Sequence, residues 1–244
     1  NDEDGLGTIS YQWKRAGAAI SGATASTYML TQADVGKAIT VTASYTDALG
    51  TDESVTSSAT AAVANVNDAP VLAITGTATE DQTLTTVVND EDGLGTISYQ
   101  WKRAGATISG ATANSYTLTQ ADVGSAITVT VSYTDVQGTA ESVTSSATAA
   151  VENVNDSPSG SVIISGTVAE DQVLTASNDL TDEDGLGSFA YQWKRAGAAI
   201  SGATSATYTL TQADVGKAIT VTASYTDAQG TDESVTSAAT AAVA

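Results

Sequence analysis

The chain contains no cysteine and no histidine. Without cysteine, disulfides and thiolate metal sites are excluded, so stability has to come from packing, from an ion bound by other ligands or from the context of an array. With no histidine, no cysteine and no serine set beside a base, the common nucleophile and acid–base arrangements of enzymes are missing. Paired carboxylates of the kind used by glycosidases remain. They recur on turn loops, however, and a repeat of about 90 residues is not expected to form a large substrate cleft beside them. We therefore expect no enzyme activity.

Basic residues are also scarce. Eight Lys and Arg oppose 28 Asp and Glu among 244 residues, which gives a net charge of −20. No basic stripe is available to displace the counterions of a nucleic acid, and an acidic membrane surface is equally unsuited as a partner. No apolar run approaches 18 residues, so we expect no direct membrane insertion. The 41% of hydrophobic residues and the presence of only two prolines favour folded cores despite the acidity.

Two sequence strings recur three times along the chain. YQWKRAG begins at residues 11, 99 and 191, which are 88 and 92 residues apart, and TQADVG begins at residues 31, 119 and 211. Periods of this size are whole domains rather than turns of a solenoid. We predict three repeats over 1–66, 67–154 and 155–244, of which the first lacks its first two strands. The initial Asn1, in place of Met, indicates an excerpt of a longer protein.

The middle repeat predicts seven short strands. The runs are 71–75, 82–88, 96–102, 106–108, 115–118, 126–134 and 141–151. In the third run Ile97, Tyr99 and Trp101 alternate with polar residues, which is the pattern of a half-buried strand. Seven strands in about 90 residues with a Trp in the third predict an all-β fold of tandem immunoglobulin-like Greek-key β-sandwiches arranged end to end.

The motifs sharpen this prediction into a resemblance. YQWKRAG resembles the third strand of bacterial immunoglobulin-like repeats, and SYTLTQADVGSAITVTVSY resembles their fifth strand, Asp-x-Gly corner and sixth strand. The usual cysteine pair of immunoglobulin domains is missing, so Trp101 is expected to pack on aliphatic side chains such as Leu84 and Val129.

The strand order also predicts where the acidic loops lie, because antiparallel strands send successive loops to opposite poles of a sandwich. Loops at the bottom of one repeat, the linker, and loops at the top of the next repeat should meet at one junction. For the second junction these residues are Glu80, Asp81, Asp122, Asn153, Asn155, Asp156, Asp182, Glu183, Asp184 and Asp227. For the first junction they are Asp34, Asn65, Asn67, Asp68, Asp90, Glu91, Asp92 and Asp135.

Such a concentration of carboxylates favours a hard cation. Calcium takes six to eight oxygen ligands from carboxylates and carbonyls, which these loops supply. The arrangement resembles the inter-domain calcium sites of cadherins, and the linker NVNDAP is similar to those of cadherin-like and immunoglobulin-like repeats in large bacterial RTX adhesins. The linker has fewer aspartates than that of animal cadherins, which leaves the number of ions open. The resemblance implies an extracellular or cell-surface stalk segment of an adhesin, with neighbouring repeats of the same chain as its partners.

Three alternatives remain. The acidic loops are also what tight turns and soluble β-arrays require. A repeat without its first two strands exposes an edge, so another chain could donate strands and build a filament or matrix from copies of the protein. Each repeat could also bind a glycan or a protein. The basic pairs that end the third strands either balance the acidic junctions or are solvated strand ends; they are Lys14, Arg15, Lys102, Arg103, Lys194 and Arg195.

Overall fold

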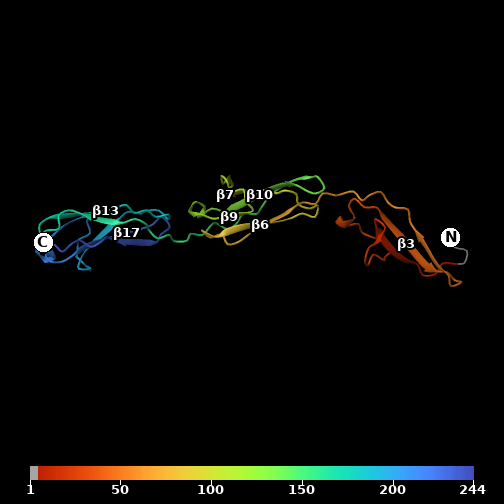
Figure 1. Ribbon diagram of the computed structural model, residues 1–244, viewed down its shortest axis with the longest axis horizontal. Helices are drawn as coiled ribbons and strands as arrows, with labels where there is room; N and C mark the ends of the chain where they lie inside the picture. The colour runs from red at the N-terminus through yellow and green to blue at the C-terminus, as the bar shows by residue number, and fades with distance from the viewer. Residues whose placement is uncertain (1–4) are drawn as a thin grey trace.

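The computed structural model describes residues 5–244 and confirms the all-β prediction. Three β-rich bodies follow one another along the long axis of the molecule, with the first and the third repeat at opposite extremes (Figure 1). Within residues 5–244 no helix is long and apolar enough to cross a membrane.

The middle repeat forms a sandwich of two antiparallel sheets. Its strands are β5 (Val71–Thr75), β6 (Thr83–Asn89), β7 (Ser98–Arg103), β8 (Ala106–Thr107), β9 (Ser115–Thr117), β10 (Ile127–Thr134) and β11 (Ala140–Thr144). One sheet has the order β5-β6-β9 and the other the order β11-β10-β7-β8. A 3₁₀ turn, Gln120–Asp122, connects β9 to β10.

The third repeat has the same topology. Its strands are β12 (Val162–Ser165), β13 (Val173–Asn178), β14 (Ala190–Arg195), β15 (Ala198–Ala199), β16 (Thr207–Thr209), β17 (Ile219–Thr226) and β18 (Asp232–Thr236), with a 3₁₀ turn at Gln212–Asp214. The sheets are β12-β13-β16 and β15-β14-β17-β18.

The first repeat has one sheet in its described part. Its strands are β1 (Ser10–Arg15), β2 (Ala18–Ala19), β3 (Ile39–Thr46) and β4 (Asp52–Thr56), with a 3₁₀ turn at Gln32–Asp34. They run in the order β2-β1-β3-β4, which corresponds to the β7-containing sheet of the middle repeat. Residues 5–66 contain no counterpart of the β5-β6-β9 sheet.

Strand alternation places the core between the two sheets. In β10 the residues Ile127, Val129, Val131 and Tyr133 are buried, while the side chains between them are more exposed. Trp101 is fully buried in one cluster with Leu84 and Val129, as the sequence predicts. The third repeat builds an equivalent cluster around Trp193.

The predicted seventh strand over 141–151 is wrong in its length. Regular pairing of β11 ends at Thr144, and the chain rejoins the ladder only through isolated bridges at Ala150 and Val151. Between these points side chains replace the backbone as acceptors: Ser145 Oγ accepts from Val129 N at 3.1 Å and Thr148 Oγ1 accepts from Ile127 N at 3.0 Å. Serine and threonine compete with the backbone in this way, so the extended segment stays bonded without being a regular strand.

Candidate metal site at the repeat junctions

Three acidic side chains from distant parts of the sequence meet at the second junction. Glu80, Asp156 and Asp184 each offer a carboxylate oxygen, and these oxygens lie within 4.8 Å of one another. Glu80 and Asp184 are each only 2% exposed, and Asp156 is half-buried. No other group of three or more acidic side chains in residues 5–244 is placed to share a metal ion.

The middle repeat and the linker position Glu80. It lies in the turn between β5 and β6, where its N–H donates to the carbonyl of Glu152 at 2.9 Å. The following residue, Asp81, adopts a left-handed conformation with φ of 62°, which reverses the chain. The linker then donates Val154 N–H to the Glu80 carboxylate at 3.3 Å. The segment that follows β11 and the linker are therefore bonded to the same turn.

The third repeat positions Asp184, in the loop between β13 and β14. One of its oxygens accepts from the N–H of Asp156 at 2.7 Å, and the other accepts from the side-chain amide of Gln120 at 3.1 Å. Asp184 thus bridges the linker and the 3₁₀ turn of the preceding repeat. Its own N–H donates to the carboxylate of Asp182, which fixes the loop.

The electrostatics of the trio disfavour its full ionisation. Burial raises the pKa of Glu80, the hydrogen bond from Val154 lowers it in part, and the charges of Asp156 and Asp184 raise it further. Burial also raises the pKa of Asp156, with additional contributions from Asp184 and Asp81. Like charges at this separation repel, and within residues 5–244 no Lys or Arg forms an ion pair with the trio.

The donor set fits a calcium ion. Calcium–oxygen distances of about 2.3–2.6 Å place ligands on opposite sides of the ion up to about 5 Å apart, which accommodates oxygens within 4.8 Å. Two buried amide oxygens have no hydrogen-bond partner in the described structure: Gln120 Oε1, on the side chain that bonds Asp184, and Asn153 Oδ1, on the residue before Val154. Unpaired buried acceptors are uncommon, and both are of the type that calcium binds. Carboxylates and amide oxygens together are a hard-cation donor set.

The first junction lacks one member of this arrangement. Asp92 is buried and accepts from the N–H of Asp68 at 2.8 Å and from the Gln32 amide at 2.8 Å, as Asp184 does at the second junction. The Gln32 amide also reaches Asn65 Oδ1 at 3.3 Å. No counterpart of Glu80 is present in residues 5–66, so two of the three carboxylates are in place.

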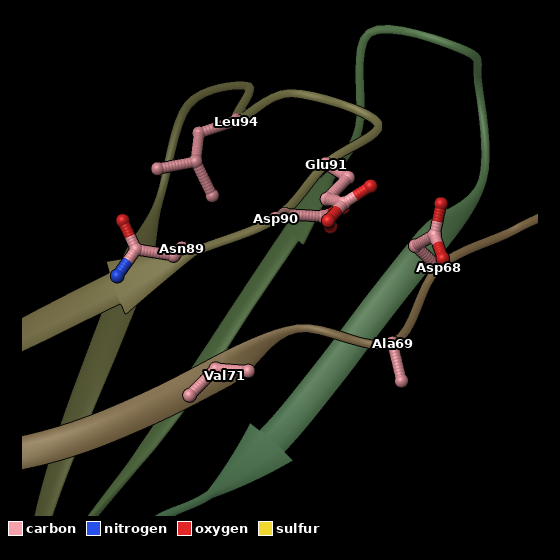
Figure 2. A pocket seen from close by; sticks show the side chains of 7 residues that line it. All are labelled: Asp68, Ala69, Val71, Asn89, Asp90, Glu91 and Leu94. Carbon is pink, nitrogen blue, oxygen red and sulfur yellow. The ribbon is translucent and has the colours of Figure 1, made fainter. Parts of the chain in front are cut away.

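A pocket of about 520 Å³ opens beside this first junction. Figure 2 shows Asp90 and Glu91 directly after β6 and Asp68 on the segment that leads into β5. The remaining lining is Ala69, Val71, Asn89 and Leu94. The structure therefore places the predicted acidic residues 68, 90 and 91 around one hollow without bringing them as close as the trio of the second junction.

Two residues predicted for the junctions lie inside their repeats. Asp122 is fully buried and accepts from Arg103 Nε at 2.7 Å, Tyr116 Oη at 2.8 Å and the N–H of Thr119 at 2.9 Å. Burial alone would raise the pKa of Asp122, but these hydrogen bonds outweigh it and lower the pKa. Asp34 has the same surroundings, and the bonds from Arg15, Thr31 and Tyr28 outweigh its burial and bring its pKa to about 2.

The other predicted residues hold loops. Asp90 and Asp182 accept from the hydroxyls of Tyr133 and Tyr225. Asp135 and Asp227 each accept from a backbone N–H four residues further on, and each keeps one buried oxygen without a partner. The linker residues Asn67 and Asn155 donate to Glu141 and Glu233 of the following repeat at 2.8 and 2.9 Å. Glu91 and Glu183 are exposed.

Sequence analysis missed the role of two side-chain types. Gln32 and Gln120, which bond the junction aspartates, stand in the repeated TQADVG string, and that repetition was the available signal. The arginines that end the third strands are neither solvated ends nor counterions of the junctions. They pair with the buried aspartates at 2.6, 2.7 and 2.6 Å; the pairs are Arg15–Asp34, Arg103–Asp122 and Arg195–Asp214.

Comparison with known proteins gives structural likeness only. No protein-family model and no curated protein matches the chain. A Ca²⁺-stabilized adhesin that helps an Antarctic bacterium reach out and bind ice shares 14% identity over 96% of this chain, with a TM-score of 0.34. The chain spans 64% of the length of that structure. The three N-terminal domains of the Highly Immunogenic Outer Capsid protein (Hoc) of bacteriophage RB49 share 19% identity over 99% of this chain and 88% of that one, with a TM-score of 0.28.

Proposed function

We propose that this chain is a non-catalytic extender segment of a large secreted or surface-attached bacterial adhesin, in which calcium fixes the angle between repeats. The observation that carries the proposal is the trio of Glu80, Asp156 and Asp184, because it joins one repeat, the linker and the next repeat at a single point. An ion bound there would tie three segments that otherwise meet through a few hydrogen bonds. The end-to-end arrangement of the repeats is the arrangement a spacer needs (Figure 1).

Several residues would hold the ion. Glu80, Asp156 and Asp184 supply charge, and Asn153 and Gln120 supply neutral oxygens. The ion would offset the repulsion among the carboxylates. At a calcium concentration ten times the dissociation constant, one such site adds about 1.4 kcal/mol to the stability of the bound form. The larger consequence is mechanical, since a hinge between repeats becomes a fixed angle.

The test measures the second junction against the first. The chain has no native cysteine, so spin labels can be placed on two cysteines at chosen positions. The substitutions Ser109→Cys and Gln229→Cys lie on exposed positions on either side of the second junction, and Ser21→Cys with Gln137→Cys are the equivalent exposed pair across the first. Pulsed electron paramagnetic resonance then gives the distribution of distances with calcium and with chelator.

We expect calcium to narrow the distribution across the second junction and to change the first much less, because the first lacks the counterpart of Glu80. The variant Glu80→Gln should abolish the narrowing. Glu170→Gln is the matched control, because Glu170 occupies the same turn of the third repeat, away from the second junction. Distributions that are equally wide with and without calcium would exclude calcium stiffening while leaving the spacer proposal in place.

A further inference from the structure

Each complete repeat has one sheet edge that the described chain leaves unpaired. Strands β5 and β12 are outermost in the sheets β5-β6-β9 and β12-β13-β16, and within residues 5–244 no bridge joins either of them to a strand on its outer side. A groove of about 210 Å³ lies beside β5 and one of about 440 Å³ beside β12. The backbone of both strands is therefore accessible from outside, and we call β5 and β12 the edge strands.

The hydrogen bonds of the neighbouring strands show which backbone groups of the edge strands are free. Thr86 lies opposite Ile74, and its N–H donates away from β5, to the carbonyl that precedes β9, at 3.0 Å. Opposite residues of an antiparallel pair either bond each other or both point away, so the N–H and C=O of Ile74 face the open side. Ala176 lies opposite Ile164 and donates to the carbonyl that precedes β16 at 2.8 Å. Ile164 of β12 therefore faces the open side in the same way.

The other edges of the two sandwiches are protected against pairing, as edges of natural sheets usually are. Strands β8 and β15 are two residues long, and β9 and β16 are three. Strands β11 and β18 carry acidic residues, which are Glu141, Asp232 and Glu233. By contrast, β5 has five residues and β12 has four, with no charge in either, and Pro70 and Pro158 precede these strands without lying in them.

Charge indicates which partner fits the edge strands. Two copies of a chain with a net charge of −20 repel each other, so they approach most easily through surfaces without charge. None of the strands β5, β6, β9, β12, β13 and β16 contains Asp, Glu, Lys or Arg. A basic partner would gain no charge attraction at these edges, whereas a second copy can meet them without bringing carboxylates together.

The edge strands are also complementary to themselves. When two copies of β12 pair antiparallel about a two-fold axis centred on Ile163, Val162 of one copy lies opposite Ile164 of the other. Both of these residues have the backbone groups that face the open side, so their N–H and C=O groups pair with each other. The two Ile163 side chains, each 47% exposed, then lie directly opposite one another. Strand β5 offers the same arrangement centred on Ala73.

We propose that β5 and β12 are the surfaces through which copies of this chain associate side by side, each edge strand pairing antiparallel with the same strand of another copy. Each contact would join two three-stranded sheets into one continuous sheet. A single pair of strands of four or five residues is a small interface, so one contact is weak. Because a chain has two edge strands, it can bind a copy at each, and association continues beyond the dimer. This lateral association goes beyond the extender function and does not depend on calcium.

The first experiment measures the weight-average mass of the full chain by sedimentation equilibrium over a series of concentrations, in chelator and at an ionic strength of about 0.15 M. We expect the mass to rise above that of the monomer as the concentration increases. Ala73→Lys together with Ile163→Lys should remove the rise, because each contact then places two lysines opposite each other. Both side chains are exposed, so these substitutions should leave the sandwiches folded.

A matched control separates the edges from the faces of the same sheets. Thr85→Lys together with Thr175→Lys makes the same change of charge at exposed positions of β6 and β13, which are the middle strands. We expect this variant to retain the rise in mass. Loss of the rise in both double variants would show that sheet faces or net charge control association, and it would overturn the proposal.

The second experiment tests the pairing register and traps weak contacts. The chain has no cysteine, so Ile163→Cys introduces a single thiol at the centre of the β12 contact. Directly opposite residues of a non-hydrogen-bonded pair have Cα atoms about 4.5 Å apart, which a disulfide can span. We expect mild oxidation to form disulfide-linked dimers several times faster for Ile163→Cys than for Thr175→Cys, on the next strand.

Three further results would overturn the proposal. One is a monomeric mass at every concentration, which would leave the edge strands to a strand of another protein. Another is a rise in mass that Ala73→Lys with Ile163→Lys does not remove, because the copies would then associate elsewhere on the chain. The third is equally fast cross-linking of Ile163→Cys and Thr175→Cys, because pairing of β12 with itself brings only residue 163 opposite its own copy.

Discussion

Arg103 Nε donates to the Asp122 carboxylate at 2.7 Å, and this pair fixes the corner between the two sheets of the middle repeat. The carboxylate is fully buried, while the arginine remains partly solvated at 32% side-chain exposure. Tyr116 and Thr119 donate to the second oxygen, so both oxygens of the aspartate are bonded from within the repeat. The aspartate therefore stabilises its own repeat and does not serve as an ion ligand at the junction.

Removing the aspartate charge should destabilise a repeat. In Asp214→Asn of the third repeat, Arg195 loses its ionic partner and one buried acceptor becomes a donor that faces other donors. We expect a loss of about 2–4 kcal/mol in the free energy of unfolding, measured by urea denaturation followed by tryptophan fluorescence. Glu183→Gln, at an exposed position in the same repeat, is the control and should stay within about 0.5 kcal/mol of the parent. A similar loss in both variants would contradict a specific role for Asp214.

The same aspartates predict how stability depends on acid. Burial alone would raise the pKa of Asp214, but the bonds from Arg195, Thr211 and Tyr208 outweigh it and lower the pKa to about 2, below its ordinary value of 3.8. A group with a depressed folded pKa stabilises the folded state above its unfolded pKa and loses that contribution as pH falls through the folded pKa. Stability should therefore decline between about pH 4 and pH 2. Thermal unfolding across this range checks the prediction, and Asp214→Asn should flatten the decline in the third repeat.

The strand positions could be predicted largely from the sequence, because alternation depends on local pattern. The run 71–75 coincides with β5, and 126–134 differs from β10 by one residue. The seventh strand was overextended because its last residues bond through Ser145 and Thr148 side chains, which no periodicity reveals.

The junction could be predicted only in part. Loop polarity correctly brings Glu80, Asp156 and Asp184 to one place, since it depends on strand direction alone. Loop polarity cannot predict that Asp122, which lies at the same pole, points inward toward Arg103. That orientation depends on the side chain that β7 provides at this position. The pole of a residue follows from topology, whereas its orientation follows from packing.

The backbone of Gly95 lies close to that of Thr134, and this contact gives a second prediction about stability. A Cβ on Gly95 would lie 2.0 Å from the carbonyl oxygen of Thr134, which only a backbone shift can relieve. We expect Gly95→Ala to cost about 3 kcal/mol or more, at the upper end of overpacking effects. Gly110→Ala is the comparison, because φ of 76° strains it but a Cβ there meets nothing within 4 Å. Its cost should be about 1–2 kcal/mol. Equal losses in urea denaturation would show that the loop relaxes around Gly95.

Calcium should reverse the effect of Glu80→Gln on the unfolding temperature. Without the ion, burial and the charges of Asp156 and Asp184 raise the pKa of Glu80, so its ionised form destabilises the folded state. A raised folded pKa stabilises below the unfolded pKa, and this contribution is lost as pH rises through the folded pKa. At neutral pH in chelator, Glu80→Gln should therefore unfold at a higher temperature than the parent, by the equivalent of about 1 kcal/mol.

In saturating calcium the order should reverse, because the variant loses a charged ligand while the parent gains about 1.4 kcal/mol at ten times the dissociation constant. Differential scanning calorimetry of both proteins in the two conditions measures all four values. Glu170→Gln should leave the order of parent and variant the same in both conditions, because Glu170 lies outside the trio. If calcium raises the unfolding temperature of Glu80→Gln as much as that of the parent, any ion that stabilises the chain is bound without Glu80, and the junction trio is not its site.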